Sequence, residues 1–216
     1  MFDEIFEGIR KKLNMDDEIR EETLKICRQS IRLSQEAVKS THRGEFKKAK
    51  EKLEENQKMI LDLESHFKNV SPRLYYKGYV MDMQQEFVEA TLFFAFIKGE
   101  PKIPSPEDLS VSKYAYLYGL GDVVGELRRH ALDAVRNENT QEADRCLDLM
   151  EEIYTLLLTL DYPDGLIPGI RRKTDVARSL IEKTRNDIAY FHHGNKLVNG
   201  MNSLLKKLKS LNTKED

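Results

Sequence analysis

Apolar residues recur every three to four positions through most of the chain, which is the spacing of one face of an α-helix. The spacing predicts helices over residues 2–13, about 17–40, 45–67, 72–98, 113–136, 141–160, about 168–191 and 196–211. No segment shows the period-two alternation that is typical of a half-buried strand. Long helices joined by short links favour an all-α fold, an antiparallel bundle of about seven long helices that forms a single domain over residues 1–216.

The predicted breaks between helices rest on capping residues, glycines and prolines. They are Asp16 or Asp17, Thr41 to Gly44, Ser71 with Pro72, the three prolines of the loop 99–110, Ser112 as a helix start, Thr140 as a cap, the turn 161–165, and Gly194. Ser71 is expected to cap the central helix, with Pro72 in its first turn. The rest of the predicted bundle is arranged around this central helix.

The central helix is mostly apolar and carries two acids, Glu86 and Glu89, between residues such as Phe87 and Val88. Residues three apart on a helix share a face, so the two carboxylates are expected side by side. Ionised acids seldom stand among apolar residues unless a metal ion or a cationic partner neutralises them. Most acid pairs at helical spacing in proteins are simply solvated. The apolar surroundings of Glu86 and Glu89 make this pair a candidate site instead.

A second acidic pair, Asp122 and Glu126, lies four residues apart on the predicted helix 113–136. Glycines at positions 119, 121 and 125 surround it. Each glycine costs a helix roughly 1 kcal/mol relative to alanine, so three of them within seven positions need a reason. Bare backbone that lets a neighbouring helix or a ligand come close is such a reason, and the central helix is the obvious neighbour.

Antiparallel packing of these two helices would bring four carboxylates together. Such a group repels itself and raises its own pKa values unless a cation is present. Mg²⁺, or Mn²⁺ in its place, binds a few carboxylates together with substrate phosphate. The expected chemistry is metal-assisted hydrolysis of a phosphoester.

Composition narrows the function classes only slightly. The net charge of -2 does not indicate nucleic-acid binding, yet it leaves room for a local basic surface. Cys27 and Cys146 have no paired spacing and are predicted to be buried, reduced thiols. No signal peptide or twenty-residue apolar run is present, so we expect a soluble cytoplasmic protein that does not bind a membrane. The basic run 171–173 is either a phosphate contact or a solvated face.

Two segments carry a family resemblance. QEFVEA, from Gln85 to Ala90, and GLGDVVGELRRHAL, from Gly119 to Leu132, together resemble the translin/TRAX family, and more closely its TRAX branch, the catalytic, C3PO-type one. The order and spacing of the predicted helices along nearly the whole chain fit the same family. The resemblance implies a seven-helix, all-α fold that assembles into closed, octamer-like shells.

The resemblance also implies an activity. The TRAX branch is a Mg²⁺-dependent endoribonuclease that acts on single-stranded RNA inside the shell. Its catalytic acids fall on Glu86, Glu89 and Asp122, with Glu126 as a further metal ligand. The resemblance places phosphate contacts on two basic residues, Arg129 and Lys77.

The implied partners are single-stranded RNA, with single-stranded DNA as a second possibility, and further copies of the same chain. A separate translin-type subunit is not required, because one gene product that carries the acids can build a homo-oligomeric shell. Two other functions stay open. One is a non-catalytic, translin-like scaffold that binds RNA or single-stranded DNA; the other is an all-α nucleoside triphosphate pyrophosphohydrolase, which also uses paired acids and Mg²⁺.

Overall fold

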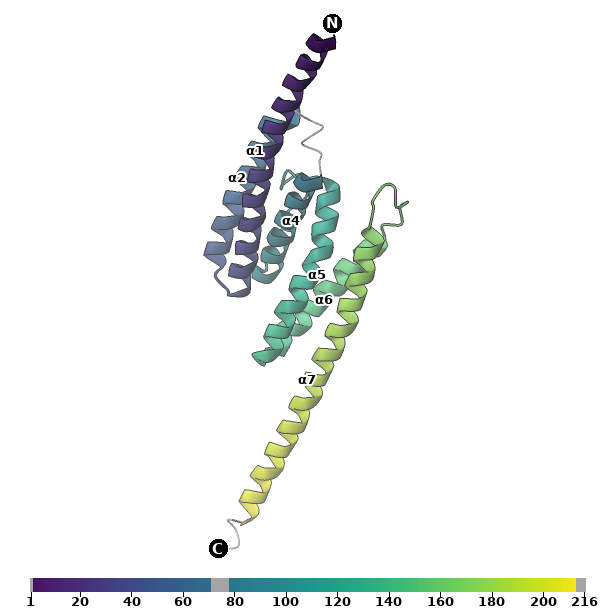
Figure 1. Ribbon diagram of the computed structural model, residues 1–216. Helices are drawn as coiled ribbons and strands as arrows, with labels where there is room; N and C mark the ends of the chain where they lie inside the picture. Colours follow the sequence, from purple (N-terminus) through teal and green to yellow (C-terminus); the bar gives the residue numbers. More distant parts are fainter. Residues whose placement is uncertain (1, 71–77, 213–216) are drawn as a thin grey trace. The chain divides into compact units, whose positions relative to one another are not determined.

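The computed structural model describes residues 2–70 and 78–212. The helices in these ranges are α1 (Phe2–His42), α2 (Phe46–Val70), α4 (Gly78–Lys98), α5 (Lys113–Arg136), α6 (Thr140–Leu158) and α7 (Ile170–Asn212) (Figure 1). No strand occurs in the described ranges, so the predicted all-α fold is confirmed. No helix among these residues is long and apolar enough to cross a membrane.

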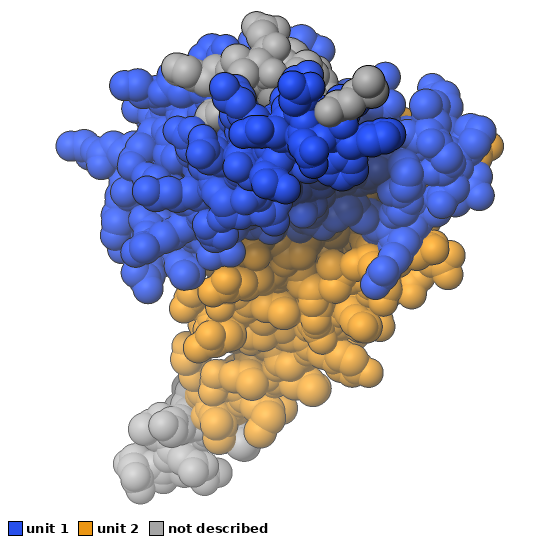
Figure 2. All heavy atoms as spheres, turned by 45° about the horizontal axis from the view of Figure 1, so that its top comes forward, with its two compact units in different colours: residues 1–123, 162–173 blue, residues 124–161, 174–216 orange. Residues whose placement is uncertain are grey.

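The chain divides into two compact units (Figure 2). Unit 1 comprises Met1–Val123 and Tyr162–Lys173, and unit 2 comprises Val124–Asp161 and Thr174–Asp216. Helix α5 contributes its first half to unit 1 and its second half to unit 2. Unit 1 is therefore built from two separate stretches of sequence, and so is unit 2.

Unit 1 is organised around α4, which packs against both α1 and α2. Its apolar residues lie on all sides of the helix, and most of them are buried. Phe87 and Phe93 are among the largest fully buried side chains. A helix that is apolar all round belongs in a core, which explains why the most hydrophobic segment of the sequence lies here.

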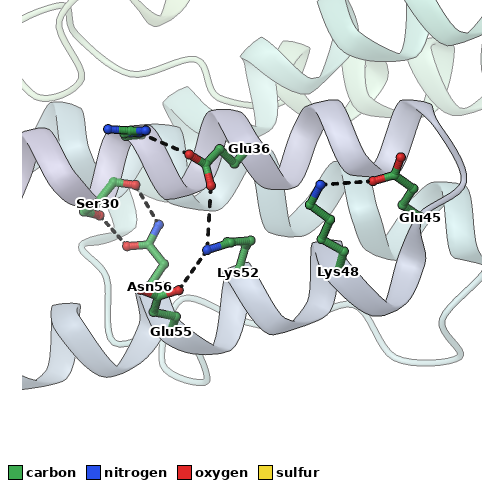
Figure 3. A network of polar contacts seen from close by, with 8 residues as sticks. Ser30, Glu36, Glu45, Lys48, Lys52, Glu55 and Asn56 are labelled. Atoms are coloured by element: carbon green, nitrogen blue, oxygen red, sulfur yellow. Dashed lines mark hydrogen bonds and ion pairs between the residues drawn. The ribbon is translucent and has the colours of Figure 1, made fainter.

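A buried polar network joins α1 and α2, which run side by side (Figures 1 and 3). Asn56 on α2 accepts a hydrogen bond from the Ser30 hydroxyl at 2.5 Å and donates to the Ser30 carbonyl at 3.0 Å and the Ser34 hydroxyl at 2.9 Å. Buried amides need such partners, because an unpaired one costs about 1–3 kcal/mol. The network therefore fixes the register of the two helices.

The predicted proline-rich loop follows α4. Gly99 has a φ of 72°, and the next residue, Glu100, donates its backbone N–H to the Ala95 carbonyl at 2.9 Å, which ends the helix as a left-handed cap. The Tyr116 hydroxyl donates to the Pro104 carbonyl at 2.9 Å, and the Ser112 backbone N–H donates to the Gln84 side chain at 3.2 Å. These bonds hold the loop against α4 and α5 within unit 1.

Unit 2 contains the second half of α5, with α6 and most of α7. Asn139 caps α6 by accepting from the Glu142 N–H at 3.2 Å, so the predicted cap, Thr140, is the first helical residue instead. Arg128 on α5 donates to Thr184 at 2.8 Å and to Asp187 at 2.9 Å, both on α7. These bonds tie α5 to α7.

Two predicted breaks were wrong. Residues 14–17 do not interrupt α1, which is continuous over 41 residues, and Gly194 does not end α7, which is continuous over 43 residues. Neither break contains a proline, and an isolated aspartate or glycine costs a helix only about 1 kcal/mol or less, which flanking helix-forming residues offset. The predicted start of the central helix, at Ser71 and Pro72, lies outside the described residues.

Candidate functional site

Helices α4 and α5 meet at Gly119. A Cβ atom at this position would lie 2.7 Å from the Gln85 carbonyl oxygen and 2.7 Å from the Val88 Cβ. No residue other than glycine fits this contact without a shift of the backbone. The prediction that bare backbone admits the central helix is confirmed at Gly119, whereas a Cβ at Gly125 would have no neighbour within 4 Å.

One helical turn beyond this contact, Asp122 reaches α4. The Gln85 side-chain amide donates to Asp122 Oδ2 at 2.6 Å. Gln85 immediately precedes Glu86, so the bond joins the two segments QEFVEA and GLGDVVGEL in space. The sequence placed these segments on facing helices but gave no sign that Gln85 forms the link.

Glu86 and Glu89 lie on α4 with partly exposed side chains. The residues between and after them, Phe87, Val88 and Ala90, are buried, as predicted. The two acids therefore stand at the edge of the core with access to solvent. Such a position lets a carboxylate stay ionised and lets a ligand reach it.

Asp122 also has a cationic neighbour that the sequence did not predict. Lys173 Nζ lies 2.5 Å from Asp122 Oδ1 and 5.9 Å from the centre of the Tyr118 ring. Both side chains of the ion pair are about one quarter to one third exposed, at 25% and 31%. We call Glu86, Glu89 and Asp122 the candidate acidic site, or the acidic site for short. Lys173 contacts it through Asp122, a contact that neither interpretation of the basic run 171–173 included.

The donor set suits a hard cation, because Glu86, Glu89 and Asp122 offer only carboxylate oxygens. Both Asp122 oxygens already accept hydrogen bonds, from Gln85 and from Lys173, so a cation at Asp122 would replace one of these partners. Among the described residues, one group of side chains brings three potential metal ligands within 4.8 Å of one another. That group lies in unit 2 and includes none of these three acids. The acids thus lie on two helices that are in contact, but they are not gathered to ligand spacing.

Two of the remaining predicted site residues belong to unit 2, and the third is not described. Glu126 and Arg129 are on the half of α5 that belongs to unit 2, where Arg129 Nη1 is 3.8 Å from Glu126 Oε2. The Arg129 side chain is exposed, as a phosphate contact must be. Lys77 lies outside the described residues.

A basic surface pocket on α1 and α2 was missed by sequence reasoning. It has a volume of about 570 Å³ and contains four cations and one acid. We call it the basic pocket; it is lined by Lys25, Arg28, Gln29, Arg32, Leu33, Glu36 and Lys52. Basic residues at 25, 28 and 32 recur at helical spacing, which is the signal that would have indicated it.

Both cysteines are buried and free, as predicted. Burial raises the pKa of the Cys27 thiol to about 11 and that of the Cys146 thiol to about 12. Thiols with such pKa values are inert as nucleophiles at neutral pH. Cysteine chemistry is therefore not part of the acidic site.

The described residues form an all-helical fold, with a candidate acidic site where α4 and α5 meet. Residues 14–214 match the Translin family. An uncharacterized protein of Methanocaldococcus jannaschii, MJ0175, is 37% identical over 183 residues, which cover 84% of this chain and 80% of that protein. The chain belongs to the Translin family.

Solved structures agree with this assignment. AfC3PO matches with a TM-score of 0.77 and 33% identity, covering 88% of this chain and 97% of its own. AfC3PO in complex with duplex RNA matches with a TM-score of 0.74 and 31% identity, over the same shares of the two chains. NeC3PO in its apo form has a TM-score of 0.77 and 25% identity, covering 86% of this chain and 96% of its own.

Proposed function

We propose that this protein is a Mg²⁺-dependent endoribonuclease that cleaves single-stranded RNA inside an oligomeric shell. The observation that carries the proposal is the contact at Gly119, which links the helix of Glu86 and Glu89 to Asp122. The three acids offer carboxylate oxygens, the ligands that Mg²⁺ prefers in proteins. The family and the geometry therefore support the same function.

In this proposal Glu86, Glu89 and Asp122 hold the cation, which when bound neutralises charge that develops on the phosphoryl group. One of the two glutamates orients the attacking water and accepts its proton. The Lys173 side chain lies beside Asp122, where it can contact a phosphate of the substrate. The roles of Glu126, Arg129 and Lys77 rest on the sequence resemblance alone.

RNA binding is supported by the similar structure of AfC3PO, which was determined with duplex RNA. The basic pocket offers this chain a surface for phosphates, since Lys25, Arg28 and Arg32 are exposed there. Duplex and single-stranded RNA present the same phosphates, so binding both is compatible with cleaving only the flexible single strand. Single-stranded DNA carries the same backbone charge, so its binding and cleavage should be measured beside those of RNA.

Oligomer formation is supported by apolar side chains that the single chain leaves exposed. They follow helical spacing near the start of α1 and towards the end of α7: Phe2, Phe6, Ile9, Leu13, Leu197, Met201, Leu204 and Leu205. Exposed apolar stripes of this kind mark surfaces that another protein covers. We assign that role to further copies of this chain.

Size-exclusion fractions of the purified protein test the proposal. We expect fractions with a mass of several chains to cleave labelled single-stranded RNA with Mg²⁺ or Mn²⁺ and to lose this activity in EDTA. The same fractions should leave duplex RNA intact.

Other outcomes would decide between the alternatives. RNA binding without cleavage in either metal would indicate the non-catalytic scaffold. Release of pyrophosphate from nucleoside triphosphates, with no RNA cleavage, would indicate the pyrophosphohydrolase. RNA cleavage found only in the fraction of single chains would contradict the proposal that cleavage takes place inside an oligomeric shell.

The basic pocket gives a separate prediction. Replacing Arg28 and Arg32 together by glutamine should weaken RNA binding and lower the slope of log affinity against log salt by about 1.4–1.8, since each phosphate contact contributes about 0.7–0.9. Filter binding at several salt concentrations measures the slope. Replacing Arg136 and Arg178, two exposed arginines on α5 and α7, changes the net charge equally and should leave the slope unchanged. Equal slopes in both double variants would show that the basic pocket does not contact the RNA phosphates.

A further inference from the structure

Three side chains of the kinds that bind metals meet in unit 2, and none of them belongs to the group Glu86, Glu89 and Asp122. His130 lies on α5, while Glu142 and Cys146 lie four residues apart on α6 and so share a face. Their ligand atoms all lie within 4.8 Å of one another. His130 Nε2 is 3.2 Å from Glu142 Oε1, and Cys146 Sγ is 3.8 Å from the same oxygen.

These distances are close to those between neighbouring ligands of a tetrahedral zinc ion. Zinc binds sulfur at about 2.3 Å and nitrogen or oxygen at about 2.0–2.2 Å, so adjacent ligands in a tetrahedron lie roughly 3.3–3.7 Å apart. The two observed separations, 3.2 Å and 3.8 Å, fall just outside this interval on either side. Small side-chain rotations would therefore complete the geometry.

The surroundings also suit a metal. Cys146 is fully buried, and the side chains of His130 and Glu142 are 19% and 22% exposed, so the group is sheltered but reachable. Arg145 Nε donates to Glu142 Oε2 at 2.8 Å and thereby orients the carboxylate with Oε1 towards His130 and Cys146. Hydrogen bonds of this kind to a ligating carboxylate tune metal sites. Arg145 Nη2 also lies 2.7 Å from Oε1 and would have to withdraw, which its 38% exposed side chain permits.

We propose that His130, Glu142 and Cys146 form a zinc site that ties α5 to α6 in unit 2, with water as the fourth ligand. Binding replaces the proton of the Cys146 thiol, which passes to solvent. A thiolate selects zinc over Mg²⁺, so this site and the acidic site would take different metals. The proposal does not depend on the nuclease.

Titration of the metal-free protein with Co²⁺ and Zn²⁺ tests the site. Co²⁺ reports a thiolate ligand through a charge-transfer band in the near ultraviolet, and calorimetry gives the zinc affinity. We expect the band to appear with one equivalent per chain and to vanish when excess Zn²⁺ is added. Cys146→Ser should abolish the band and weaken zinc binding by at least about tenfold.

The other cysteine supplies the matched control. Cys27 is equally buried and lies in unit 1, so Cys27→Ser should keep the band and the affinity. His130→Gln should also weaken zinc binding. Because His130 is partly exposed, this variant replaces Cys146→Ser in the test if Cys146→Ser does not fold. A wild-type protein without the band, or a band that survives in Cys146→Ser, would overturn the proposal.

Discussion

The variant Glu89→Gln is expected to lose RNA cleavage and to retain RNA binding. The substitution keeps the size of the side chain and its partly exposed position on α4, but it removes the negative charge that the proposed cation needs. Metal ions contribute several kcal/mol to such reactions, so the cleavage rate should fall roughly 10³-fold or more. Glu86→Gln should behave in the same way. Single-turnover cleavage and filter binding, measured on the same preparations, separate the two effects.

Asp82 provides the control for this experiment. It lies on α4 one helical turn before Glu86, and it is exposed. Asp82→Asn removes the same charge from the same helix and should cleave RNA at the wild-type rate. If Glu89→Gln also cleaved normally, the assignment of the acidic site would be wrong. A parallel loss in Asp82→Asn would show that the charge of α4 matters rather than the particular carboxylate.

The variant Gly119→Ala is expected to destabilise the protein although alanine favours helices. The added Cβ would meet the Gln85 carbonyl oxygen and the Val88 Cβ, each at 2.7 Å, and neither atom belongs to the flexible end of a side chain. Overpacking of this kind typically costs 1–3 kcal/mol. The free energy of unfolding, measured in urea, should fall by about that amount. Cleavage should fall too, because the shift separates Gln85 from Asp122.

Gly125 lies on the same helix, and its replacement by alanine is expected to change the free energy of unfolding in the opposite direction. An added Cβ there has no neighbour within 4 Å, so Gly125→Ala should stabilise the protein by about 0.5–1 kcal/mol through helix propensity alone. A Gly119→Ala variant as stable as Gly125→Ala would show that α4 and α5 do not pack closely at this point.

The core of unit 1 was predictable because its pattern is local. The apolar run around Glu86 and Glu89 and the prolines after Gly99 each act within a few residues. The glycine at 119 indicated a close approach of the central helix, but not which of its residues make the contact. Helix ends near Asp17 and Gly194 were mispredicted for the opposite reason. A weak helix breaker does not end a helix by itself, because helix formation is cooperative and the boundary also depends on how stable the flanking helical segments are.

The particular side chains that pair across long sequence separations could not be predicted. Lys173 beside Asp122 and Cys146 near His130 both require the packing of separate helices. A sequence pattern gives the face of a helix on which a residue lies but not the residue that packs opposite. The basic pocket, shared by α1 and α2, was missed for the same reason.

The order in which unit 1 is assembled from the chain bears on its synthesis. Its first stretch ends at Val123, and its second begins only at Tyr162, after the whole of α6 has been translated. When Asp122 leaves the ribosome, Lys173 has not yet been made, and Tyr118 still lacks the Pro168 carbonyl to which it donates. Nascent chains generally fold domain by domain from the amino terminus. Here the amino-terminal unit must wait for a later stretch, so the acidic site is completed only after much of the other unit has emerged.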